Sequence, residues 1–328
     1  MKSLQKINLI GAFVLMCCLF AVSSAQSYLT AQESARSDKI TNSAIEKTTL
    51  VAGDADIEIT INVPAFQLTL WQNGKEVKSY WIGVGLKDFP IYIGDRFASE
   101  VIWNPNWIVP DSEWVSERAD VKPGEVIKPT DPRNPIGKLK IPLGDGYLIH
   151  QAKGTTDLGS LVSHGCVRMM KADLYDLAEK IVQARALPLT AKQIEAAKTS
   201  SKTVAAKLDP TVPVEITYDT IVVEAGKLHV YPDVYDLKTN SVENLRKELK
   251  TSGIDDSNIT DATLGKIIAR TIGKKQFVVG AESVEQDLAL TNGRLVSVVG
   301  GATQPNTKTV IKKKSANGAG LRPRRVAL

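Results

Sequence analysis

The stretch IEITINV, residues 57–63, alternates apolar and polar side chains without interruption. Successive side chains of a β-strand point to opposite faces, so this period of two predicts a half-buried strand. A second apolar-rich run covers residues 67–72, and Asn73-Gly74, a pair typical of tight hairpin turns, separates it from a third over 77–84. The folded part of the chain is therefore expected to begin as a β-hairpin or meander.

Further short apolar segments, separated by Pro and Gly, lie at 98–103, 138–141 and 147–150. Strands of this length and spacing favour an all-β sandwich or barrel. Residues 171–184 instead place apolar side chains at helical spacing, and 189–207 predicts a second helical segment. Strands are expected again at 212–216, 220–224 and 228–231, as part of the same β domain.

The region beyond these strands predicts two helices at 241–251 and 261–271 and two strands at 276–279 and 294–299. The predicted fold class is therefore mainly β, a sandwich or barrel with one or two peripheral helices, plus a small α+β C-terminal extension. The predicted parts are a signal peptide at 1–25, a linker at 26–55, the main β domain at 56–235, the extension at 236–303 and a basic, disordered tail at 304–328.

The signal peptide is inferred from Lys2 and Lys6, the apolar run 7–22 and the small residues 23–25. A retained membrane anchor is the alternative, although the apolar run is shorter than the ~20 residues of a membrane span. Export of the protein is the expected consequence of cleavage.

The positive net charge of the chain, +5, is concentrated at its ends. Two lysines lie in the first 25 residues and seven Lys or Arg lie after Thr303, which leaves the body from Gln26 to Thr303 near −4. The body also has no basic patch interleaved with aromatic residues. A nucleic-acid partner is therefore not expected.

Cleavage of the signal peptide would remove Cys17 and Cys18 and leave Cys166 as the single thiol. A single cysteine forms no internal disulfide, so it is either a small buried hydrophobe or a reactive group. His150 and His164 are available as bases, and a nearby base or cation lowers the pKa of a thiol.

Two neighbouring residues complete the chemistry predicted at Cys166. Arg168 is a fixed cation, and Gly165 allows the backbone N–H groups of residues 165 and 166 to converge on a developing oxyanion. Zinc bound by His150, His164 and Cys166 is the alternative, but their spacing matches no common zinc pattern.

The segments GYLIH, residues 146–150, and SHGCVRM, residues 163–169, are similar to the L,D-transpeptidase catalytic domain family (YkuD). The segments WNPNW at 103–107 and NPIG at 134–137 also resemble Gram-negative members of that family. The resemblance covers about residues 56–235 and implies a mainly β catalytic domain.

The resemblance implies a role for each site residue. Cys166 is the expected nucleophile, His150 the base and His164 an orienting or proton-transferring group. The N–H groups of Gly165 and Cys166 are expected to form the oxyanion hole, and Arg168 to hold a substrate carboxylate. Further substrate-binding residues are expected to be Ser163, Gln151, Trp103 and Trp107, with Gln151 standing where the family usually has Gly.

The implied reaction is acyl transfer on peptidoglycan stem tetrapeptides in the periplasm. The thiolate would attack the carbonyl of the third, diamino-acid residue, expel the terminal D-Ala, and pass the thioester to an acceptor amine, without any cofactor. The acceptor would be another stem peptide, giving a 3-3 cross-link, or a wall-anchored protein. Hydrolysis by the same site, as a carboxypeptidase or amidase, and a non-catalytic peptidoglycan-binding protein are the alternatives. The sequence leaves the oligomeric state open.

Overall fold

The computed structural model describes residues 56–300, apart from 186 and 188. The predicted signal peptide, linker and basic tail lie outside these residues. None of the described helices combines the length and apolar character that crossing a membrane requires.

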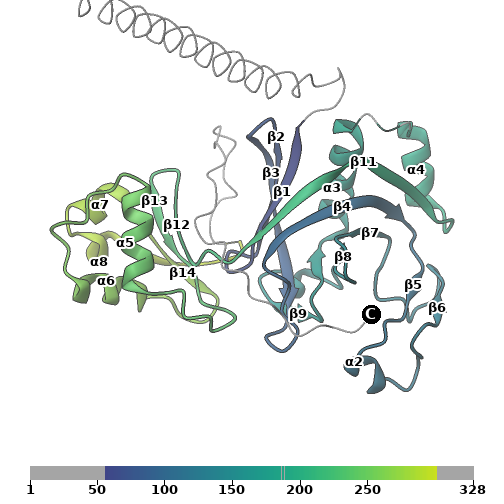
Figure 1. Ribbon diagram of the computed structural model, residues 1–328, viewed down its shortest axis with the longest axis horizontal. Coiled ribbons are helices and arrows are strands. Elements are labelled where there is room, and N and C mark those ends of the chain that lie inside the picture. The colour runs from purple at the N-terminus through teal and green to yellow at the C-terminus, as the bar shows by residue number, and fades with distance from the viewer. Residues whose placement is uncertain (1–55, 186, 188, 301–328) are drawn as a thin grey trace, which may run out of the picture. The chain divides into compact units, whose positions relative to one another are not determined.

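The main sheet has nine strands, and Figure 1 labels all of them except β10. They are β1 (Ile57–Asn62), β2 (Gln67–Gln72), β3 (Lys75–Gly85), β4 (Gly94–Trp103), β7 (Leu139–Pro142), β8 (Leu148–Gln151), β9 (Leu161–Ser163), β10 (Val167–Met169) and β11 (Val204–Thr217). Their order is β10-β8-β7-β4-β11-β1-β2-β3-β9, and an additional β10–β3 pairing closes the sheet on itself. The predicted barrel-like, mainly β fold is confirmed.

Alternation along the strands builds the core inside this closed sheet. Ile57, Ile59 and Ile61 are all at most 1% exposed, as the period of two predicts. Helix α3 (Lys171–Ala184) matches the predicted helix and packs on β7 and β8 through Leu174, Leu177 and their neighbours. Helix α4 (Ala191–Thr199) occupies only part of the helical segment predicted at 189–207, because residues from Val204 onward join strand β11.

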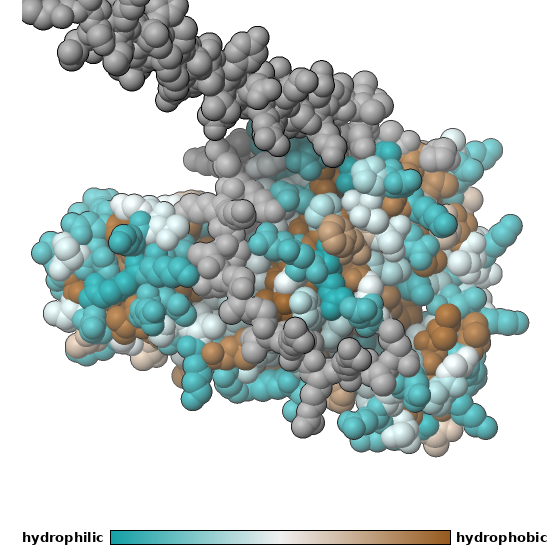
Figure 2. Space-filling model, viewed as in Figure 1, coloured by the Kyte–Doolittle hydropathy of each residue, from teal (hydrophilic) through white to brown (hydrophobic). Residues whose placement is uncertain are grey.

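An insertion between β4 and β7 forms a small unit with a core of its own. It contains β5 (Trp107–Ile108), the short helix α2 (Glu113–Ser116) and β6 (Val126–Ile127), and β5 pairs with β6. Trp107 and Ile127 point into this small core, whereas Ile108 and Val126 are 64% and 57% exposed. Figure 2 shows apolar surface over this hairpin.

The C-terminal region forms a second sheet in the order β12-β13-β14-β15. Its elements are β12 (Ile221–Glu224), β13 (Lys227–Val230), α5 (Val242–Thr251), α6 (Asp261–Ile268), β14 (Lys275–Gly280), α7 (Ala281–Glu285), α8 (Ala289–Asn292) and β15 (Arg294–Ser297). A separate apolar core that includes Leu245, Leu264 and Phe277 holds it together. The expectation that the strands at 220–224 and 228–231 extend the first β domain was wrong, because β12 and β13 form this second sheet with β14 and β15.

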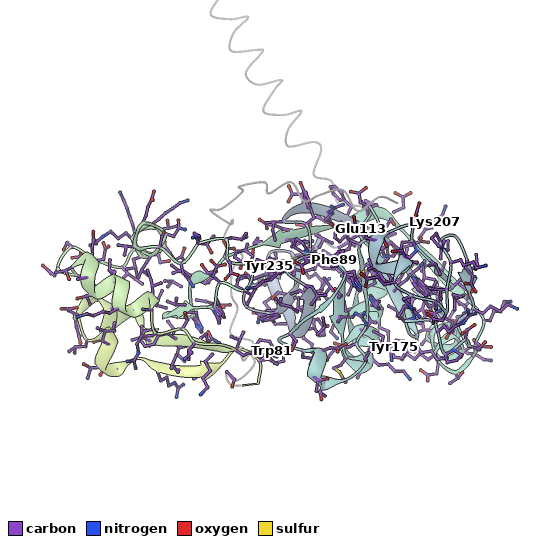
Figure 3. All side chains as sticks on the ribbon, turned by 90° about the horizontal axis from the view of Figure 1, so that it is seen from below. Trp81, Phe89, Glu113, Tyr175, Lys207 and Tyr235 are labelled. Carbon is purple, nitrogen blue, oxygen red and sulfur yellow. The ribbon has the colours of Figure 1, made fainter. Side chains whose placement is uncertain are left out.

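The segment that follows β13 braces the main β domain. The Tyr235 hydroxyl donates to the Gly85 carbonyl at 3.0 Å and accepts the Ile91 N–H at 3.4 Å. Lys87 forms an ion pair with Asp236 beside it. Figure 3 labels Tyr235 and Phe89, which belong to this contact region. The brace supports the loop after β3, which lies against the loop that carries Cys166.

Candidate active site

Three basic side chains occupy facing positions on three adjacent strands. Strand β8 lies between β7 and β10, and His150 pairs with Lys140 on one side and Arg168 on the other. Cross-strand partners project from the same face of a sheet, so these three side chains form one row. All three line a pocket of about 1420 Å³ that also receives Cys166 and His164.

His150 is held as a neutral ring. It is 2% exposed, and its Nδ1 lies 3.3 Å from the Ile136 carbonyl oxygen, which only accepts hydrogen bonds. Nδ1 therefore carries the proton and Nε2 keeps its lone pair. Burial lowers the pKa of His150 to about 3, and the charges of Arg168 and Lys140 act in the same direction.

Cys166 lies in the loop between β9 and β10, beside the start of β8. Its Sγ is 4.0 Å from the Gly146 carbonyl oxygen. Burial raises the pKa of the thiol, although the Leu148 backbone N–H and the charge of Arg168 favour the thiolate. This direction is opposite to the lowering inferred from sequence, because removal from water outweighs the nearby cation.

The loop that presents Cys166 depends on two residues before it. Gly165 has φ of +108°, and a Cβ atom there would lie 2.8 Å from the Tyr147 ring. Only glycine fits both the conformation and the space. The Ser163 hydroxyl donates to the Cys166 carbonyl at 2.5 Å and thereby closes the turn. Ser163 is 1% exposed, so its hydroxyl is committed to the loop.

Arg168 is a buried cation with unused donors. Arg168 is 9% exposed, and its Nε and Nη1 atoms have no hydrogen-bond partner among the described residues. Burial lowers the pKa of Arg168, and the charges of Cys166 and Asp157 oppose that change. Arg168 lines the pocket, so its guanidinium places a fixed positive charge in the pocket wall that favours an anion there.

His164 is fixed by aromatic rings. Its ring stacks on Trp114 with a centroid distance of 4.3 Å and meets Phe89 edge-on at 4.7 Å. Trp107 stacks in turn on Trp114 at 6.3 Å. Burial and the charge of Arg168 lower the pKa of His164, which favours its neutral form. The insertion thus forms one wall of the site.

The remaining predicted substrate-binding residues have different placements. Trp103 is 1% exposed in the main core and does not line the pocket, so its predicted contact with substrate was wrong. Trp107 lines the pocket. Gln151 also lines it, but its Oε1 accepts the Lys138 N–H at 3.0 Å, which turns the side chain onto the neighbouring backbone.

Two pocket residues were not among the predicted site residues. Trp114 stacks on the His164 ring and holds it in place. Lys140 was missed, although it lies between the core residues Leu139 and Ile141 and therefore points to the other face of β7. The described residues contain no group of three His, Cys, Asp or Glu placed to hold a metal ion.

The part of the chain that carries this site is similar to a known protein family. Residues 56–216 match the model of the L,D-transpeptidase catalytic domain, YkuD. A curated relative, "Probable L,D-transpeptidase YbiS" from Escherichia coli K12, is 32% identical over 102 residues. That match covers 30% of this chain and 33% of the relative, so only about a third of the relative's length is matched.

Solved structures that match part of this chain include an L,D-transpeptidase from Mycobacterium smegmatis, at 14% identity and a TM-score of 0.32, covering 50% of this chain and 59% of that one. Another is L,D-transpeptidase 3 from Mycobacterium tuberculosis in complex with a faropenem-derived adduct, at 13% identity and a TM-score of 0.31. That likeness covers 50% of this chain and 60% of the other.

Proposed function

Residues 56–216 carry an L,D-transpeptidase catalytic domain, and on that premise we propose that the protein transfers peptidoglycan stem peptides through a thioester on Cys166. The observation that carries the proposal is the neutral, buried His150 in the same pocket as this thiol. Its Nε2 has a free lone pair because Nδ1 is bound to the Ile136 carbonyl.

In the first half-reaction, Cys166 Sγ attacks the carbonyl carbon of the third, diamino-acid residue while His150 Nε2 takes the thiol proton. The raised thiol pKa favours this coupled transfer over a preformed thiolate. The N–H groups of Gly165 and Cys166 stabilise the oxyanion. The C–N bond then breaks, and His150 returns its proton to the departing D-Ala amine.

In the second half-reaction, an acceptor amine attacks the thioester carbonyl. A new C–N bond forms, the C–S bond breaks, and the amine's proton returns through His150 to the Cys166 sulfur. An amine on another stem peptide gives a 3-3 cross-link, and an amine on a protein anchors that protein to the wall. We place the reaction in the periplasm, after export.

Arg168 holds a carboxylate of the donor peptide in this proposal. Its Nε and Nη1 lack partners, and it belongs to the same strand end as Cys166. Trp107 and Trp114 form an apolar wall for the peptide and fix His164 as an orienting group. Gln151 shapes the pocket beside His150, and Ser163 supports the Cys166 loop.

Hydrolysis of the same thioester by water is the second candidate, because it shares the whole first half-reaction. A non-catalytic wall-binding protein is the third. Incubation of the protein with disaccharide-tetrapeptide, followed by mass spectrometry, separates the three. A dimer lacking one D-Ala supports transfer to a stem peptide, tripeptide alone supports hydrolysis, and unchanged substrate with a reduced thiol contradicts both enzymatic functions.

A further inference from the structure

Lys140 is a cation in the pocket that the proposed reaction has not used. It is half-buried, lines the pocket and directly faces His150 across the β7–β8 pairing. Among the described residues it forms no ion pair and no side-chain hydrogen bond, and Glu100 is the acid that influences it. Two other pocket cations are neutralised, Arg118 by Asp120 and Arg133 by Asp131.

The position of Lys140 relative to the reacting groups differs from that of Arg168. Arg168 follows Cys166 on the same strand end, whereas Lys140 lies on the far side of His150. Adjacent strands are about 4.8 Å apart, so the two cations flank the imidazole at similar separations. The acyl group bound to Cys166 is therefore expected to lie nearer Arg168. The amine that exchanges a proton with His150 is expected to extend toward Lys140.

The group that exchanges a proton with His150 is first the leaving amine and then the acceptor amine. The second half-reaction is the reverse of the first with a different amine, so both amines occupy one position. The leaving D-Ala carries a carboxylate on the carbon next to its amine. Where the diamino acid is a dicarboxylic one such as diaminopimelate, its distal amine also has a carboxylate on the adjacent carbon. A protein lysine side chain has only methylene groups there.

We propose that Lys140 binds the carboxylate next to the reacting amine and so selects α-amino carboxylates, of leaving group and acceptor alike, over protein lysines. The inference rests on the proposed function and narrows it to cross-linking between stem peptides. The carboxylate would supply the anionic partner that Lys140 lacks, and the charge-assisted hydrogen bond would fix the amine near His150 Nε2.

The test uses the full chain, disaccharide-tetrapeptide as donor, and two acceptors that differ only in the carboxylate. These are D-methionine and D-methioninamide, and the exchanged tetrapeptide is measured by mass spectrometry. We expect wild-type kcat/KM to favour D-methionine by about tenfold or more. Lys140→Met should abolish that preference mainly by raising the KM for D-methionine, and should slow the acylation step that transfer to both acceptors shares.

Two further variants keep the result interpretable. Lys140→Arg should retain the preference because it retains the charge. Lys153→Met removes an exposed lysine from the pocket rim and should also retain it. Alkylation of Cys166 by iodoacetamide, a neutral reagent, at the wild-type rate shows that each variant has an intact site.

The inference is overturned if Lys140→Met keeps the preference for D-methionine, or if the wild-type protein favours the amide. Release of D-Ala with only tripeptide as product also overturns it, while the thioester chemistry stands. Absence of any D-Ala release contradicts the proposed function itself, and the inference falls with it.

Discussion

The imidazole of His150 and the carbonyl of Ile136 form the contact that fixes the state of the proposed base. Nδ1 lies 3.3 Å from the Ile136 oxygen, so the ring presents an unprotonated Nε2 to the pocket. The same carbonyl accepts the backbone N–H of Gln151. The insertion that ends at Ile136 thus sets the tautomer of His150 as well as forming a wall of the site.

The pH dependence of turnover follows from this arrangement. Burial, Arg168 and Lys140 disfavour the imidazolium and lower the pKa of His150 to about 3. The base should therefore stay neutral as the pH falls from 7 to about 4. We expect kcat/KM to show no acid limb near pH 6.5, measured by D-Ala release from tetrapeptide. A clear loss of activity with a midpoint near pH 6.5 would contradict this prediction.

The lowered pKa of His150 also predicts how the free energy of unfolding depends on pH. The unfolded chain binds a proton at His150 below about pH 6.5, whereas the folded chain binds it only near pH 3. The lowered pKa therefore destabilises the folded state progressively as the pH falls from about 6.5 toward 3. His150→Phe should weaken the decline of the unfolding free energy over this range, measured by urea titration. If the unfolding free energies of the wild type and His150→Phe declined equally with pH, the lowered pKa of His150 would be contradicted.

Cys166 is predicted to be the site of acylation. Cys166→Ala should reduce turnover by at least about a thousandfold while changing the melting temperature little. A carbapenem should add its mass to the wild-type protein, and peptide mapping should place the adduct on Cys166. Addition of the same mass to Cys166→Ala would show that another residue is the nucleophile.

Gly165→Ala should damage both the fold and the site. The new Cβ would lie 2.8 Å from the Tyr147 ring, at a φ of +108° that alanine rarely adopts. We expect a stability loss of about 2 kcal/mol and at least a tenfold loss of activity, since the oxyanion donors would move.

Gly226→Ala is the matched control for this prediction. Gly226 also has a positive φ, +72°, but a Cβ atom there would meet nothing within 4 Å. Backbone strain at residue 226 should lower the free energy of unfolding by about 1 kcal/mol and leave activity unchanged. Similar activity losses in the two variants would remove the special role assigned to Gly165.

Arg168→Met should separate stability from function. Arg168 is 9% exposed, and its guanidinium Nε and Nη1 have no hydrogen-bond partners, which is a costly arrangement in the folded state. An apolar side chain of similar length should leave the unfolding free energy unchanged or raise it by up to about 2 kcal/mol. Turnover of tetrapeptide should fall about a hundredfold.

Calorimetry and steady-state kinetics on the same preparation check this prediction. Arg294→Met, on the exposed start of β15, is a control that should change neither quantity. A large drop in melting temperature for Arg168→Met, with activity retained, would show that Arg168 is a structural cation.

Local pattern predicted much of the fold because each element carried its own periodicity. The helix at 171–184 matches α3 at both ends, since its apolar residues repeat at helical spacing. The partners of a strand carry no such signal. Residues 221–224 and 227–230 alternate like the earlier strands, yet β12 pairs with β13, and β13 pairs with β14 (Lys275–Gly280) far along the chain. Trp103 likewise gave no sign of which side of its strand faced the core.

By itself, the sequence determined which groups are present at the site, because Cys166, His150, His164, Gly165 and Arg168 lie within two short segments of recognisable spacing. Only the tertiary structure decided their chemical state. Closure of the sheet buries His150 between two cations and partly buries Cys166, and burial changes the energy of a charge in a way that residue order does not encode. The pairing of β7 with β8 also brings Lys140 opposite His150, because facing positions depend on strand register.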